Sequence, residues 1–94
     1  MGVMLDPVVK DEQGCWHHHS APNASTGWTY ASWKRILDAL CLGEAHVTVG
    51  RMPIVMLERH LDRFGLNIQE GYEQELRALI FYCQENGYSH IGWA

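Results

Sequence analysis

The chain has 94 residues, of which 47% are hydrophobic and 19% charged, and its formal net charge is −4 with histidine neutral. This balance excludes intrinsic disorder as the main state, and the length allows one domain with a modest core. No apolar run reaches the 18 residues of a membrane span, and Asp6 and Pro7 interrupt the first ten residues where a secretory signal would be apolar. We therefore expect a single small domain over residues 1–94, located in the cytoplasm.

The charges and the cysteines indicate which class of partner and which cellular compartment to expect. Residues 67–94 hold four glutamates and Arg77 as the one basic residue. No basic stripe is present, which argues against direct nucleic-acid binding and favours a basic protein surface as a partner. The three cysteines have no zinc-site spacing, and Cys41 and Cys83 fall on apolar helical stripes. We expect these two thiols to be buried, in a reducing compartment.

Residues 1–28 have no sustained periodicity, and we expect a partly irregular arm. The apolar patches around Leu5 and Val8 are separated by Asp6 and Pro7, which allows a short strand. Residues 21–27 contain Pro, Asn, Ser, Thr and Gly and are typical of a loop.

Three helices are predicted next, at about 30–42, 53–64 and 68–86. The first has Thr29 as N-cap and Gly43 as terminator, with Lys34, Arg35 and Asp38 facing away from its apolar stripe. Pro53 suits the first turn of the second helix. Asn67 and Glu70 have the spacing of a capping box at the start of the third, and Asn86-Gly87 ends it.

The tail over 88–93 alternates in polarity, which predicts a strand. A single strand needs a partner, and the candidates are residues 3–9 and 13–20; residues 46–50 form a short strand or a loop. The predicted fold class is α+β, with three helices and a small sheet made of the C-terminal strand and an N-terminal segment. An all-α bundle with irregular arms is the alternative.

The segment Cys15-Trp16-His17-His18-His19 is the most unusual local feature. On a strand, His17 and His19 share one face, and imidazole is a preferred ligand of zinc and copper. Same-face neighbours lie about 7 Å apart, so a metal would need a further ligand from His46, His60 or His90. The alternative is a histidine run without metal, and we expect no cofactor.

Catalytic and DNA-reading motifs are missing. The chain has no nucleophile elbow, no cysteine-histidine family signature and no P-loop, so we do not expect an enzyme. The second and third helices could form a helix-turn-helix around Gly65, but Glu70 and Glu73 would then face phosphates. A plain antiparallel helical hairpin is the better interpretation.

The chain is rich in aromatic residues, and Phe81 and Tyr82 lie off the main stripe of the third helix. Such residues either anchor interfaces or pack under the N-terminal arm. We expect a non-enzymatic protein-interaction module that uses Glu70, Glu73, Glu75, Phe81 and Tyr82. Small size, acidity and the lack of catalytic motifs fit a phage or mobile-element inhibitor of a host defence protein.

Two alternatives remain open beside that hypothesis. One is a metal-binding module that uses His17 and His19. The other is a protein that sequesters a small nucleotide between aromatic rings, with Lys34, Arg59 or Arg63 on the phosphate. A homo-oligomer is compatible with any of the three.

Overall fold

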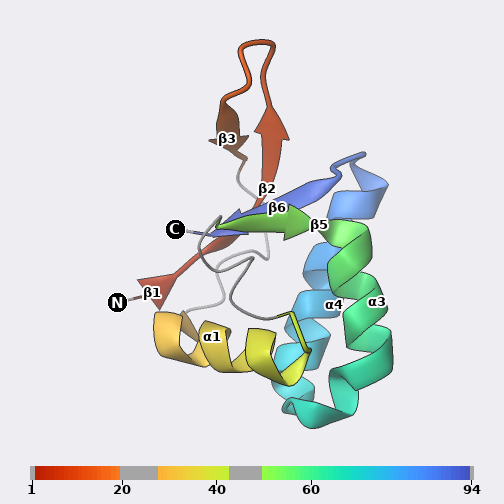
Figure 1. The fold of residues 1–94 in the computed structure, drawn as a ribbon. Coiled ribbons are helices and arrows are strands. Elements are labelled where there is room, and N and C mark those ends of the chain that lie inside the picture. The colour runs from red at the N-terminus through yellow and green to blue at the C-terminus, as the bar shows by residue number, and fades with distance from the viewer. Residues whose placement is uncertain (1, 20–27, 43–49, 94) are drawn as a thin grey trace.

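The computed structural model describes residues 2–19, 28–42 and 50–93, and over these residues the fold is α+β (Figure 1). Three α-helices and a four-stranded antiparallel sheet confirm the predicted class. The helices are α1 (Tyr30–Ala39), α3 (Ile54–Phe64) and α4 (Glu70–Glu85), with the 3-10 turn η1 (Gly65–Asn67) between α3 and α4. The strands are β1 (Gly2–Val3), β2 (Leu5–Lys10), β3 (Trp16–His18), β4 (Trp28–Thr29), β5 (Arg51–Pro53) and β6 (His90–Trp93).

The main sheet has the order β3-β2-β6-β5. The C-terminal strand therefore pairs with an N-terminal segment as predicted, with Leu5 opposite Trp93 and Pro7 opposite Ile91. Residues 5–10, within the segment that we described as an irregular arm, form β2 at the centre of this pairing. On its other side β6 pairs with β5, and β1 pairs separately with β4.

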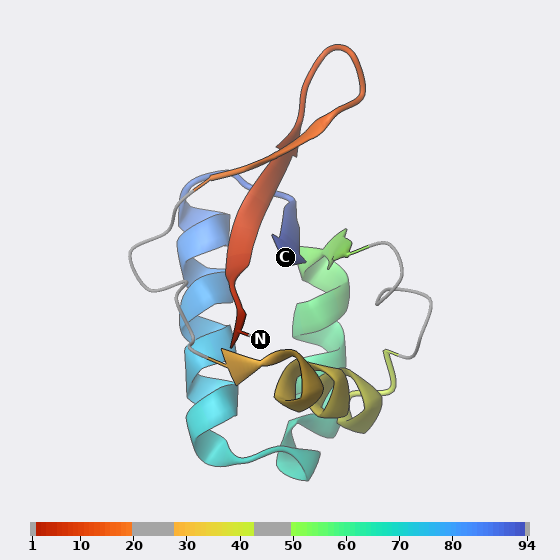
Figure 2. The same cartoon turned by 90° about the vertical axis from the view of Figure 1, so that its left-hand side faces the viewer.

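Side chains alternate along each strand, and the register of the strand pairs shows which of them lie on the same face of the sheet. Leu5, Met52 and Ile91 lie on one face, which we call the inner face, and are buried in one core cluster with side chains of all three helices. Asp6, Trp16, Arg51 and His90 lie on the other, the outer face. In Figure 1 the helices lie below the sheet, and the β2–β3 hairpin extends upward beyond it; Figure 2 shows the same hairpin from the side.

Helix α1 begins as predicted and ends earlier. Thr29 is the N-cap, and its side chain accepts a hydrogen bond from the Ser32 amide. The helix ends at Ala39, and Leu42 donates its amide proton to the Leu37 carbonyl while Cys41 takes a left-handed φ of 58°. Cys41 is exposed, so its predicted burial is wrong. Burial of Leu42 beyond the turn compensates the strain of about 1–2 kcal/mol that a non-glycine residue meets at this φ.

The beginnings of α3 and α4 differ from the predictions by one or two residues. Pro53 is the last residue of β5 and the N-cap of α3, because its extended ψ lets it pair with His90 before the helix starts. The predicted capping box is wrong. Gln69 is the N-cap of α4, and the Asn67 side chain donates to the Ala39 carbonyl at 3.3 Å.

The end of α4 is as expected. Tyr88 donates to the Cys83 carbonyl, and Gly87 adopts the left-handed φ that this helix ending requires. Glycine meets no steric penalty in this conformation, which explains why the Asn86-Gly87 pair was a good signal. Among the described residues, no helix is sufficiently long and apolar to span a bilayer.

Candidate functional site

The residues proposed as an interaction site from sequence all lie on α4, but they do not share one face. Glu70 and Phe81 are about three turns apart and point outward together. Glu73 points toward α3, and its carboxylate lies 3.2 Å from Arg77 Nε. Glu75 and Tyr82 lie on the opposite flank, since residues two apart on a helix point in nearly opposite directions.

Phe81 is the exposed apolar residue of this set. Its side chain is 64% exposed in the middle of a regular helix. Tyr82 is half-buried and stacks on Tyr88 with ring centroids 6.4 Å apart, so it contributes to packing. Of the two aromatic residues predicted to be interface anchors, Phe81 is therefore the one available to a partner.

Two polar bridges between α3 and α4 flank Phe81. Arg77 donates to Asp62 at 2.9 Å, and Gln84 donates to Glu58 at 3.0 Å. Arg77 and Gln84 are helical neighbours of Phe81, one turn before it and one turn after. The hydrogen bond to Asp62 is the main cause of the raised pKa of Arg77, with Glu73 adding to it. We call Phe81 with these two bridges the Phe81 surface.

The Phe81 surface is acidic. Asp62 and Glu73 pair with Arg77, Glu58 accepts a hydrogen bond from Gln84, and Glu85 lies one turn after Phe81 on α4, which leaves an excess of carboxylates around an exposed aromatic ring. Because the bridges connect both helices, the part of α4 that carries Phe81 is braced against α3. This arrangement suits recognition of a basic surface with an apolar pocket.

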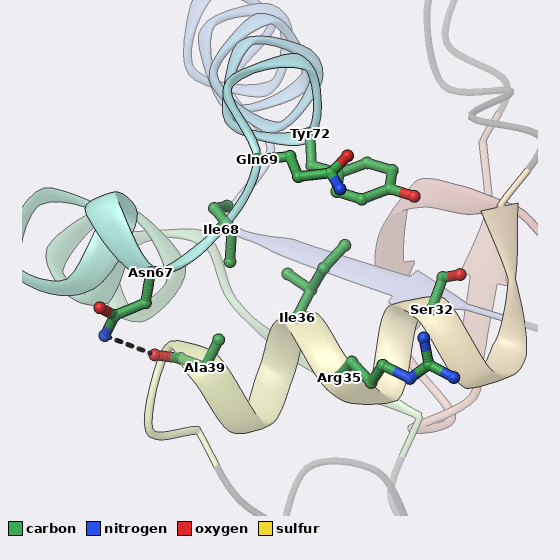
Figure 3. A pocket seen from close by; sticks show the side chains of 8 residues that line it. All are labelled: Ser32, Arg35, Ile36, Ala39, Asn67, Ile68, Gln69 and Tyr72. Carbon is green, nitrogen blue, oxygen red and sulfur yellow. Dashed lines mark hydrogen bonds between the residues drawn. The ribbon is translucent and has the colours of Figure 1, made fainter.

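A second feature, missed by the sequence analysis, is a groove between α1 and the start of α4, with a cavity volume of about 200 Å³ (Figure 3). We call it the α1–α4 groove. The lining residues from α1 follow a helical stripe, and those from the other side include the N-cap of α4. They are Ser32, Arg35, Ile36, Ala39, Asn67, Ile68, Gln69 and Tyr72. Arg35, which periodicity placed on the solvent side of its helix, borders this groove.

The histidine run is divided between the two faces of the β2–β3 hairpin. His17 Nε2 lies 2.7 Å from an Asp11 carboxylate oxygen, and His18 Nδ1 lies 3.4 Å from Asp6. His19 contacts the Tyr88 ring, with centroids 5.7 Å apart. The hydrogen bond from His17 is the largest cause of the lowered pKa of Asp11.

Among the described residues, no third ligand joins His17 or His19. In the described ranges, no three histidine, cysteine or acidic side chains come together in a metal-binding arrangement. Of the further ligands considered, His60 lies 2.7 Å from the Leu40 carbonyl, and His90 contacts Trp16; His46 is outside the described residues. The geometry therefore gives the metal-binding hypothesis no support beyond the residue types.

The arginines suggested for a phosphate lie around a small hollow. Arg59, His60, Arg63 and Phe64 enclose about 60 Å³, and the Arg63 guanidinium lies over the Phe64 ring at 5.4 Å. Small-molecule sites usually measure about 300–1,000 Å³. This hollow is too small to hold a nucleotide.

Comparison with protein-family models, with curated proteins and with solved structures gives no match in any of the three.

Proposed function

We propose that the protein is a non-enzymatic interaction module that binds a basic protein partner through the Phe81 surface. The observation that carries the proposal is the 64% exposure of Phe81 between two cross-helix bridges. A large aromatic ring with this exposure leaves apolar area in water, which a partner pocket would remove. Phenylalanine burial at an interface typically supplies much of the affinity.

The charges around Phe81 support a basic partner. Carboxylates at the rim of an apolar anchor accelerate encounter with a positive surface and oppose docking on a negative one. Such a module acts by occupation of a site, as an inhibitor or adaptor does, and an inhibitor encoded by a phage or mobile element is one form of it. The free thiols of Cys15, Cys41 and Cys83 suit a reducing cytoplasm.

The test is capture of a partner from host lysate by tagged protein, followed by measurement of affinity with the purified partner. Phe81→Ser should weaken binding by at least about tenfold, since loss of a central aromatic anchor costs about 2 kcal/mol or more. Leu66→Ser is the matched control, because Leu66 is 99% exposed but lies in η1, outside the Phe81 surface.

A charge test separates the acidic rim from the aromatic anchor. Glu85→Lys should reduce the association rate and make the affinity less dependent on salt, whereas Glu75→Lys on the other flank of α4 should change it less. Equal binding by wild type and Phe81→Ser, or a partner with an acidic binding surface, would contradict the proposal.

A further inference from the structure

The α1–α4 groove contains a single unpaired charge. Arg35 is the one charged lining residue, and none of the ion pairs among the described residues involves its guanidinium. The nearest acids along α4 have other partners, because Glu73 bonds to Arg77 and Glu70 accepts a hydrogen bond from Gln74. Asp38 lies one turn after Arg35 on α1, outside the groove, and does not pair with it. A ligand in the groove would therefore meet one guanidinium that has no ion-pair partner among the described residues.

The lining of the groove mixes apolar side chains with polar ones. Figure 3 shows Ile36 and Ser32 on the α1 side, facing Gln69 and Tyr72 at the start of α4, with Ile68 between the two. The Trp28 ring meets Tyr72 edge-on, with centroids 5.0 Å apart, and supports that wall. The hydrogen bond from Asn67 to Ala39 ties η1 to α1 at one end of the groove. The cavity is thus held open by contacts that do not depend on a ligand.

These features select a ligand by size and charge. A volume of about 200 Å³ is below the range of about 300–1,000 Å³ typical for drug-sized molecules, so the occupant is about as large as one apolar side chain. A guanidinium matches a carboxylate through two parallel hydrogen bonds. A phosphate dianion would need more positive charge than Arg35 supplies, and Glu70 and Glu73 begin the adjacent helix.

We propose that the α1–α4 groove binds an apolar group that carries a carboxylate. The carboxylate pairs with Arg35, and the apolar body lies against Ile36, Ile68 and the Tyr72 ring. The Gln69 amide lines the side of the groove that faces α1. This site is independent of the proposed function, because Tyr72 and Phe81 are two and a half turns apart and so lie on opposite sides of α4.

A free carboxylic acid and the C-terminal residue of a peptide both have this chemistry. The experiment is an NMR titration of the isotope-labelled full chain with five probes, one of which is inorganic phosphate. Two are 4-methylpentanoate and its neutral amide, and two are a tripeptide ending in leucine with a free or an amidated terminus. We expect saturable shifts at Ile36 and Ile68 with both acids, and binding weaker by about tenfold or more with both amides.

The relative affinity of the two acids identifies the source. A peptide that binds more tightly than 4-methylpentanoate indicates a chain end as the natural ligand, and equal or weaker binding indicates a free acid. Absence of saturable shifts with either acid at a dissociation constant below about 10 mM would overturn the proposal. So would equal shifts with the amides, or tighter binding of inorganic phosphate than of either acid.

A pair of variants tests whether the carboxylate of the ligand binds to Arg35. Arg35→Gln removes the guanidinium and should weaken acid binding about tenfold, with no effect on the amides. Lys34→Gln makes the same change of net charge at the adjacent exposed residue, outside the groove, and should leave the affinity within about twofold. Equal losses in the two variants would show a general charge effect and overturn the assignment to Arg35. Backbone amide spectra of the free variants check that each remains folded.

Discussion

The inner and outer faces of the four-stranded sheet come from the same strands but are stabilised in different ways. On the inner face, Leu5 and Ile91 have no exposed surface and pack into the core. On the outer face, the Arg51 guanidinium lies 4.8 Å from the Trp16 ring centroid, and Trp16 contacts His90 at 4.9 Å. The inner face thus depends on apolar burial alone, whereas the outer face combines the buried Val8 side chain with short-range polar and aromatic contacts.

This difference predicts how each face responds to change. Apolar burial is insensitive to pH and costs the most to disrupt, whereas pairs among charged and aromatic side chains at the surface contribute little and titrate. Substitutions on adjacent strands, and even at adjacent residues of β6, can test the two faces separately.

The largest effect is expected at the centre of the inner face. Ile91→Ala removes a fully buried side chain from β6, between β2 and β5, and should lower the free energy of unfolding by about 2–5 kcal/mol. Urea denaturation followed by tryptophan fluorescence measures it. A loss below about 1 kcal/mol would show that the core around Ile91 is loose.

The next effect is steric and lies on the outer face. A Cβ at Gly92 would lie 2.6 Å from Val8 Cγ1, and valine has little freedom to move. Gly92→Ala should therefore cost about 1–3 kcal/mol. Adding Val8→Ala removes this contact and leaves the milder 3.3 Å approach to the Gly50 carbonyl oxygen, so the double variant should be at least about 1 kcal/mol more stable than the sum of the single effects predicts. Additive losses would show that the clash is not the cause.

Gly71→Ala is the control for Gly92→Ala. A Cβ at Gly71 has no atom within 4 Å, and the position lies within α4. The substitution should raise the free energy of unfolding by about 0.5–1 kcal/mol, because alanine loses less backbone entropy in a helix. A destabilising effect would indicate a contact that the described residues do not show.

A third prediction concerns the pH response of the outer face. Burial, and then the Arg51 charge, lower the pKa of His90 from its ordinary 6.5. Protonation is thus easier in the unfolded chain, so the stability from neutral His90 is present above pH 6.5 and is lost as pH falls through the lower folded pKa. Arg51→Gln should raise the His90 pKa toward its ordinary value without reaching it, as followed by NMR titration.

His90→Gln is the complementary test, since it removes the titrating group. The difference in unfolding free energy between pH 7.5 and pH 5 should become smaller than in the wild type. Asp11 also has a lowered pKa, but its contribution is lost only as pH falls below its ordinary 3.8, so it does not add to the difference between pH 7.5 and pH 5. If the difference in unfolding free energy between pH 7.5 and pH 5 were unchanged, the pH dependence would come from groups other than His90.

The smallest effect is expected for the contact between Asp6 and His18 at the edge of the outer face. Asp6 and His18 are 3.4 Å apart, and the His18 side chain is 43% exposed. Asp6→Asn should change the free energy of unfolding by less than about 0.5 kcal/mol, and added salt should reduce the difference further. A larger loss would mean that the outer face contributes more to stability than a solvent-exposed pair can.

Cysteine reactivity distinguishes interior from surface without any substitution. Burial raises the pKa of the Cys83 thiol to about 11, while Cys15 and Cys41 are exposed. A thiol reagent at pH 7.5 should therefore modify Cys15 and Cys41 quickly in the native protein, and Cys83 only after denaturation. Rapid modification of Cys83 would show that α4 opens on the timescale of labelling.

The sequence predicted best where the signal is local. Thr29 caps α1, and Gly87 ends α4, because capping side chains and left-handed glycines act within a few residues. The apolar stripes of the helices identified Ile36, Leu57 and Leu76 as core residues through their spacing, and all three are buried. Cys41 was misplaced because the turn after Ala39 ends the helical period on which its predicted burial depended.

The candidate surfaces were harder to predict. Periodicity found Phe81 off the buried stripe, but the bridges beside it join residues that are far apart in sequence. The α1–α4 groove gave no signal, because its two walls come from separate helices and Asn67 was assigned a local capping role. The side chain of Asn67 instead bonds to Ala39, a contact that exists only after the helices have packed.

The sequence by itself determined the fold class, the three helices and the pairing of the C-terminal strand with the N-terminal segment. These follow from the period of apolar residues, which sets the side of each element that leaves water. Only the tertiary structure decided that β5 joins the sheet, that Arg35 borders a groove and that Phe81 stays exposed. The reason is that such features depend on the distance between elements, and long-range packing sets that distance.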